Sequence, residues 1–161
     1  MVLEKIRRDV LSGRNIEEVL EKFDWKNFEQ IVAEIFKSND FIVYPNLRFK
    51  TKKRYEIDLI AKRRNIVLCI DCKEWSRGRH KKTGLRYAIK KQKERVKELV
   101  KFLKGNPIAE NKLKMNVKDK FYPLIVTLFL EELVKENGSF IVPVWKLNSF
   151  LLEIESYLSL I

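Results

Sequence analysis

The sequence predicts an α/β fold in which a central mixed β-sheet is flanked by helices. Two observations predict it. Short apolar runs of strand length recur along the chain, and amphipathic stretches of helical length separate them. Their order is a helix, three strands, a helix, two strands and a helix. The chain has 161 residues, 45% of them hydrophobic, so it can build the full core of one domain.

The N-terminal part of the chain is predicted to be helical. Apolar residues within 2–11 follow an amphipathic helical spacing. Asn15 is expected to cap a short helix over 16–23. Asp24 is expected to cap a longer helix, Trp25–Lys37, which carries an apolar stripe.

Three strands are predicted to follow. Phe41–Tyr44 reads as a short strand that Pro45 stops, and Leu47–Arg54 is a basic stretch with strand-like alternation. Two apolar runs, Tyr55–Ala61 and Ile66–Cys72, flank a short basic turn. Their lengths favour a β-hairpin.

The second half of the chain contains a loop, a long helix and two further strands. Ser76–Gly84 is rich in Gly, Arg and Lys, and Leu85–Leu103 has one apolar and one lysine-rich side. The remaining expectations are a polar irregular loop with one helical turn over Ile108–Lys120, a buried strand over Tyr122–Leu130, one helical turn within Glu131–Asn137, a last strand over Phe140–Val144 and a closing helix over Lys146–Leu160.

Three charged residues lie inside the predicted hairpin, where strand cores rarely hold charge: Asp58, Asp71 and Lys73. Side chains alternate along a strand, so Asp71 and Lys73 point the same way, and Asp58 can join them from the partner strand. Carboxylates are rarely buried unless they are paired or bind a metal. The trio therefore favours a divalent-cation site. The alternative is an ion pair in which Lys73 neutralises one carboxylate.

Asp58 followed by Asp71-Cys72-Lys73 resembles the signature of the PD-(D/E)xK nucleases, the restriction-endonuclease-like superfamily. Ile57 stands where that signature has proline. The superfamily core has the order αβββαβ, and the resemblance covers roughly Trp25–Leu130. It implies one nuclease-like domain, with an N-terminal helical extension over 1–24, a catalytic core over 25–130 and a C-terminal strand and helix over 131–161.

The resemblance implies Mg²⁺ or Mn²⁺ as the cofactor. Asp58 and Asp71 would supply carboxylate oxygens, and the backbone carbonyl of Cys72 a further ligand. Lys73 would position or activate the attacking water and stabilise the charge of the transition state.

Two further site residues come from the flanking helices. The segment FEQIVAEIF resembles the first helix of the restriction-type and archaeal Holliday-junction-resolvase branches, in which an additional acid precedes the VA pair by three residues. That acid is Glu29, expected as a catalytic residue and a metal ligand, with Glu34 as the alternative. Gln92 matches a glutamine that touches the lysine or the scissile phosphate in some branches. A surface glutamine is the alternative.

The charge of the chain favours a polyanionic partner. Lys and Arg number 34 against 22 Asp and Glu, a formal net charge of +12. DNA is the expected partner, with RNA as the alternative. Many Lys, Glu and Ile and few Gln resemble hyperthermophile usage. The residues expected to contact the nucleic-acid backbone are Lys52, Lys53, Arg54, Arg77, Arg79, Lys81 and Lys82.

No membrane association is expected. The longest apolar run, Phe121–Leu130, is too short to span a bilayer, and the first ten residues have no hydrophobic signal region, so a cytoplasmic location is expected. Cys69 and Cys72 are three apart on a strand and should face opposite sides, which favours packing cysteines over a metal clasp. A redox role is the alternative.

The expected function is a metal-dependent DNA endonuclease that hydrolyses phosphodiester bonds in branched or foreign DNA. The alternative is a non-catalytic nucleic-acid-binding or assembly module on the same fold. Symmetric cutting of two strands would need a homodimer, for which Val142–Ile161 is a candidate interface that is as readily explained as core.

Overall fold

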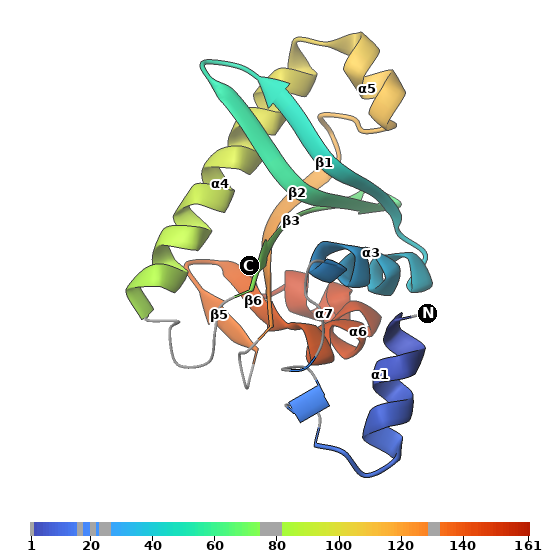
Figure 1. The fold of residues 1–161 in the computed structure, drawn as a ribbon. Helices are drawn as coiled ribbons and strands as arrows, with labels where there is room; N and C mark the ends of the chain where they lie inside the picture. Colours follow the sequence, from blue (N-terminus) through green and yellow to red (C-terminus); the bar gives the residue numbers. More distant parts are fainter. Residues whose placement is uncertain (1, 16–17, 20–21, 23–26, 75–81, 129–132) are drawn as a thin grey trace.

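The computed structural model describes residues 2–15, 18–19, 22, 27–74, 82–128 and 133–161. Within them a six-stranded mixed sheet has helices on both faces (Figure 1). The strands lie in the order β1-β2-β3-β4-β6-β5. Their bounds are β1 Ile42–Lys50, β2 Arg54–Arg63, β3 Ile66–Lys73, β4 Lys120–Thr127, β5 Val134–Glu136 and β6 Ser139–Pro143.

Antiparallel pairing joins β1 to β2 and β2 to β3, and parallel pairing joins β3 to β4 and β4 to β6. The short strand β5 pairs antiparallel with β6. A parallel neighbour needs a long crossover connection. Helices α4 and α5 belong to the crossover connection from β3 to β4. The helices are α1 Val2–Leu11, α3 Phe28–Ser38, α4 Lys82–Lys104, α5 Pro107–Leu113, α6 Val144–Leu152 and α7 Ile154–Leu158.

Two sets of helices bury the two faces of the sheet. Helices α3, α6 and α7 share a core with inward-facing residues of β2, β3 and β4 on one face, and α4 and α5 cover the other (Figure 1). Helix α1 lies apart from the sheet in both views. The predicted α/β class and the order αβββαβ are confirmed. The order arises because each apolar face of the sheet must be covered by an amphipathic helix.

The predicted hairpin is confirmed, and its neighbour β1 is longer than expected. Nine residues of β1 run through Pro45, which we expected to stop the strand. Because β1 is at the edge of the sheet, the missing N–H of Pro45 is tolerated there. Asn46 takes up the local distortion with a φ of 49°.

Two expectations near the C-terminus are wrong. Within Glu131–Asn137, residues 134–136 form β5 instead of a helical turn. Asn137 and Gly138 have φ values of 48° and 71° and connect β5 to β6, because this dipeptide favours a tight hairpin turn. The closing helix is divided at Glu153 into α6 and α7.

Other differences are smaller. The stretch after α4 contains a helix, α5, because the Asn106 Oδ1 accepts a hydrogen bond of 3.0 Å from the Ala109 N–H and caps it. Many apolar side chains of the candidate interface Val142–Ile161 lie in the core, among them Leu147, Phe150 and Ile154, whereas Leu152, Leu160 and Ile161 are exposed. The predicted caps and helix over 16–26 lie largely outside the described residues.

Candidate active site and its cleft

The hairpin brings the two aspartates together. The ladder between β2 and β3 ends at the pair Leu59 and Ile70, so Asp58 and Asp71 follow it directly across from each other. Beyond that point the Cys72 N–H donates a hydrogen bond of 2.9 Å to the Asp58 Oδ2. The Asp58 side chain thus takes the place of a backbone partner on β2, and this hydrogen bond holds the Asp58 carboxyl against β3.

Asp71 is a buried acid with two cationic neighbours. It is 5% exposed. The Lys73 Nζ lies 3.1 Å from its Oδ2, and the Arg95 guanidinium 3.7 Å from its Oδ1. Although the Lys73 distance is that of an ion pair, its orientation does not make a hydrogen bond. Among the residues that the structure describes, the Asp71 Oδ2 is therefore buried without a hydrogen-bond partner.

The pKa of Asp58 reflects this crowding. Burial raises the pKa of the Asp58 carboxyl, and the Cys72 N–H acts in the opposite direction. The negative charge of Asp71 and a hydrogen bond between the two carboxyl groups raise it further, while Lys73 lowers it. Burial beside a second carboxylate thus disfavours the charged form of Asp58.

Glu29, on helix α3, is an acid whose pKa the charges of the two aspartates affect. It is half-buried in the first turn of α3. Burial raises the pKa of Glu29, and the charges of Asp58, Glu56, Glu74 and Asp71 add to the effect in that order. Glu56 itself pairs with the Arg48 Nε at 3.1 Å.

The acidic side chains at this site offer oxygen ligands for a divalent cation. In the described part of the chain, no three His, Cys, Asp or Glu side chains already form a group that could hold a metal. Glu29 therefore does not complete a preformed three-residue cage. Asp58 and Asp71 nevertheless fit Mg²⁺, which keeps several waters and often uses only one or two carboxylates. The unsatisfied Asp71 Oδ2 is an oxygen that such an ion would satisfy.

Gln92 occupies a different position from the expected contact with the lysine or the phosphate. Its side chain is 1% exposed, beneath the cleft. The Gln92 amide nitrogen donates to the Cys69 carbonyl at 2.8 Å, and its oxygen accepts from the Arg95 guanidinium at 2.9 Å. Gln92 thus fixes α4 to β3 and holds Arg95 near Asp71.

Asp71 and Lys73 lie in the wall of a cleft of about 530 Å³ between the β2–β3 hairpin and α4, whereas Asp58 and Glu29 are not part of its lining. Basic side chains outnumber acidic ones in its lining, which favours an anionic occupant. The basic residues are Lys53, Arg54, Lys73, Lys91 and Arg95, and the acidic ones are Glu56, Asp71 and Glu94. A second hollow, of about 610 Å³, adjoins the cleft and shares Arg54, Tyr55 and Glu56 with it.

The comparison with known families decides the family of the chain. Residues 24–144 match the family described as NERD, the nuclease-related domain. The chain belongs to the nuclease-related domain family. Its residues are also 32% identical, over 136 positions, to an uncharacterized protein of Archaeoglobus fulgidus, covering 84% of this chain and 95% of that protein. The matched range contains the hairpin and the cleft, so the predicted resemblance to nucleases is confirmed at the level of the family.

Three solved structures match this nuclease-related domain at TM-scores below 0.5. The protein of unknown function AF1548 matches with a TM-score of 0.48 and 18% identity over 83% of this chain and 67% of that one. The small subunit of the heterodimeric restriction endonuclease R.BspD6I matches with a TM-score of 0.46 and 14% identity over 88% and 76%. Protein VC1899 from Vibrio cholerae matches with a TM-score of 0.37 and 12% identity over 81% and 32%.

The residues predicted to contact nucleic acid are distributed unevenly in the nuclease-related domain. Lys53 and Arg54 line the cleft, whereas the Lys52 Nζ lies outside its lining, 3.7 Å from Glu94. Lys53 is also 3.5 Å from Glu94. Lys82 begins α4. Arg77, Arg79, Lys81 and the side chain of Lys82 lie outside the described residues.

The two cysteines face opposite sides of the sheet, as expected. Cys69 is buried in the core under α4, and Cys72 packs against the core under α3. Burial raises the pKa of the Cys69 thiol to about 12 and also raises that of Cys72. Protonated thiols on opposite faces cannot hold one metal, which supports the interpretation of both as packing residues.

Sequence reasoning missed the burial of Gln92 and two residues of the cleft, Arg95 and Tyr87. A signal for Gln92 exists: it lies four residues after Ala88 and four before Val96, inside the apolar stripe of α4. Arg95 is three residues further on and shares that side of the helix.

No described helix is long and apolar enough to cross a membrane.

Proposed function

We propose that this nuclease-related domain is a divalent-metal-dependent DNA endonuclease. The observation that carries the proposal is the pair of facing carboxyl groups of half-buried Asp58 and buried Asp71, of which Asp71 lies beside Lys73 in the wall of a basic cleft. Leaving a buried carboxylate oxygen without a hydrogen bond costs free energy. A cation bound between the carboxyl groups would recover this energy and would stand where a phosphate enters the cleft.

Asp58 and Asp71 would hold the ion together with the Cys72 carbonyl, and Glu29 would approach through water. Bound Mg²⁺ or Mn²⁺ would supply Lewis-acid stabilisation of the phosphate charge and a more acidic water. Lys73 lies on the same strand face as Asp71, where its ammonium would orient the attacking water and oppose the developing charge. Its ion pair with Asp71 holds that ammonium in place.

The remaining cleft residues would bind the DNA strand. Arg54, Lys91 and Arg95 line the same cleft as Asp71 and would contact phosphates on either side of the scissile bond. Such contacts fix the register of the strand without reading its sequence. Gln92 has a supporting role, because it holds the Arg95 guanidinium from below.

The direct test is cleavage of linear, nicked, branched and single-stranded DNA by the purified protein with Mg²⁺ or Mn²⁺. Asp58→Asn, Asp71→Asn and Lys73→Met should each lower the rate at least about 100-fold, the effect of losing one transition-state contact. Asp119→Asn is the matched control, because it also breaks a largely buried ion pair, with Lys62 at 2.9 Å, outside the cleft lining. If no DNA form is cut with either metal, the proposal is wrong.

One observation favours the alternative of a non-catalytic nucleic-acid-binding module. Lys73 and Arg95 already place positive charge beside Asp71 without any metal. Isothermal titration with Mn²⁺ separates the two functions. A nuclease should bind the ion and lose it in Asp71→Asn, whereas a binding module should bind DNA but take up no Mn²⁺. A parallel digest of RNA of the same sequence decides between DNA and RNA as substrate.

A further inference from the structure

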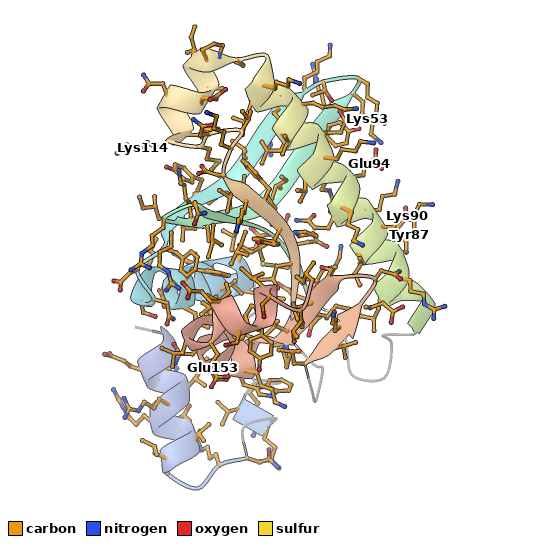
Figure 2. All side chains as sticks on the ribbon, turned by 180° about the vertical axis from the view of Figure 1, so that it is seen from behind. Lys53, Tyr87, Lys90, Glu94, Lys114 and Glu153 are labelled. Atoms are coloured by element: carbon orange, nitrogen blue, oxygen red, sulfur yellow. The ribbon has the colours of Figure 1, made fainter. Side chains whose placement is uncertain are left out.

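An exposed aromatic ring stands at the side of the cleft. Tyr87 is 61% exposed and lines the same cleft as Asp71 and Lys73. It also lines a neighbouring hollow of about 660 Å³, on the β5–β6 side of α4. Figure 2 shows Tyr87 and Lys90 next to each other on the outer side of α4, with Glu94 and Lys53 further along the helix. Tyr87 thus forms a ridge between two hollows.

The surroundings of this ridge are basic on both sides. The Lys91 Nζ lies 5.6 Å from the centre of the Tyr87 ring, a cation–π contact that leaves much of the ring in solvent. Arg54 and Arg95 line the cleft on one side, and Lys90 lines the hollow on the other. A flat apolar ring between positive charges is the surface that single-stranded nucleic acids use, since bases stack on the ring and lysines follow the backbone.

The core gives no reason for an aromatic residue at this position. Its neighbours Leu85, Ala88 and Ile89 turn inward and pack against Ile125 and Ile141, whereas Tyr87 points away from that cluster. A large ring in water forgoes the free energy that burial of its apolar surface would supply. A ligand that covers the ring would recover that free energy.

We propose that Tyr87 is a stacking platform for an unpaired base, so that the substrate class is DNA with a single-stranded stretch beside the scissile phosphate. The inference rests on the proposed function, because it takes the cleft as the path of the DNA strand. In an intact duplex the faces of each base are covered by its neighbours. A ring that stands at the level of the backbone can therefore stack only on a base that has left the helix.

The test compares two labelled DNAs of the same sequence, one fully paired and one with a short single-stranded gap, by fluorescence anisotropy in a chelating buffer that prevents cleavage. Tyr87→Ala should weaken binding to the gapped DNA by about tenfold, the typical cost of losing one base–aromatic stack. Binding to the paired DNA should change by less than about twofold, because backbone contacts remain. Tyr87→Phe should bind as the wild type does, because it keeps the ring.

Ile108→Ala is the matched control, since Ile108 is 81% exposed on α5, outside the cleft lining. A 2-aminopurine base in the gap reports stacking directly, and its quenching on binding should be lost in Tyr87→Ala. Equal weakening for gapped and paired DNA, or no weakening, overturns the inference. So does a Tyr87→Phe variant that behaves like Tyr87→Ala. Tighter binding of single-stranded RNA of the same sequence shows that DNA is the wrong substrate class.

These binding measurements distinguish a failure of the inference from a failure of the proposed function. If the protein cuts DNA with Mn²⁺ but Tyr87→Ala treats gapped and paired DNA as the wild type does, the stacking platform alone is wrong. If the protein prefers gapped DNA through Tyr87 but cuts nothing with either metal, the platform stands and the nuclease activity is overturned.

Discussion

Replacing Asp71 by asparagine should remove metal binding while leaving the metal-free fold nearly as stable. Asn has almost the same shape as Asp, so the substitution tests charge alone. In the metal-free protein the Asp71 carboxylate lies 3.1 Å from Lys73 and 3.7 Å from Arg95. It also shares a hydrogen bond with the Asp58 carboxyl. These contacts have opposite effects on stability.

The net effect on stability can be bounded from these contacts. Breaking a fully buried ion pair costs about 3–5 kcal/mol. Here the Lys73 and Arg95 side chains are 33% and 29% exposed, so water can solvate them once Asp71 is neutral. Neutralising Asp71 also relieves its repulsion of Asp58. We therefore expect the free energy of unfolding to fall by only about 1 kcal/mol, or about 2–4 °C in Tm for a domain of this size.

Mn²⁺ should have a larger effect on the wild type. A ligand at about 100 times its Kd stabilises the folded state by about 2.7 kcal/mol. For a chain of 161 residues this corresponds to about 5–11 °C in Tm. Differential scanning fluorimetry over a series of Mn²⁺ concentrations resolves this shift easily. The wild type should show it and Asp71→Asn should not.

The control variant is Asp119→Asn, which breaks the ion pair with Lys62 and should keep the full Mn²⁺ shift. The reasoning is refuted if Asp71→Asn keeps the same shift as the wild type. It is also refuted if metal-free Asp71→Asn loses about 3 kcal/mol or more, because Asp71 would then be a structural ion-pair partner of the kind expected in a buried core.

Three further predictions concern Gln92, Asp58 and Cys72. Gln92→Leu should lower the free energy of unfolding by about 1–3 kcal/mol in a urea titration, because the Cys69 carbonyl loses a buried donor. It should also lower the cleavage rate as Arg95→Ala does, and a rate equal to that of the wild type would contradict the role of Gln92 in holding Arg95. The pKa of Asp58 is raised above its ordinary value, so its protonated form stabilises the metal-free protein at low pH, and this stability is lost as the pH rises through the folded-state pKa. The Mn²⁺-induced Tm shift should therefore grow with pH, and a shift that is larger at pH 5 than at pH 7.5 would show that the acid pair does not bind the ion. Cys72→Ala should retain DNA cleavage with Mn²⁺, because only the backbone carbonyl of Cys72 is expected to contact the metal, and a loss as large as that of Asp71→Asn would implicate the thiol.

The sequence by itself determined the hairpin and the shared face of Asp71 and Lys73. Strand alternation is a local property that holds wherever the strand is placed. The position of Asp58 opposite Asp71 followed once the short turn had set the register of the hairpin. The signature Asp58 with Asp71-Cys72-Lys73, which suggested the family resemblance, also lies within this one hairpin, so it could be recognised without any tertiary contact.

Other features depended on local signals that were misread. Asn137-Gly138 is a strong hairpin signal, yet its strand β5 has only three residues, too few to show alternation. Pro45 indicated a strand end because proline lacks the N–H that a strand residue donates to its neighbour. Its position in an edge strand is set by the order of the strands, which the sequence does not display.

Only the tertiary structure decided what α4 contributes to the site. The rotation of this helix is set by the packing of Leu85, Ala88 and Ile89 against β4 and β6, contacts between segments far apart in the chain. That rotation buries Gln92 under the cleft, directs Arg95 toward Asp71 and leaves Tyr87 exposed at its side. Hydrophobic periodicity fixes which face of a helix is buried, but the partner residues and the cleft between them arise only when the sheet is assembled.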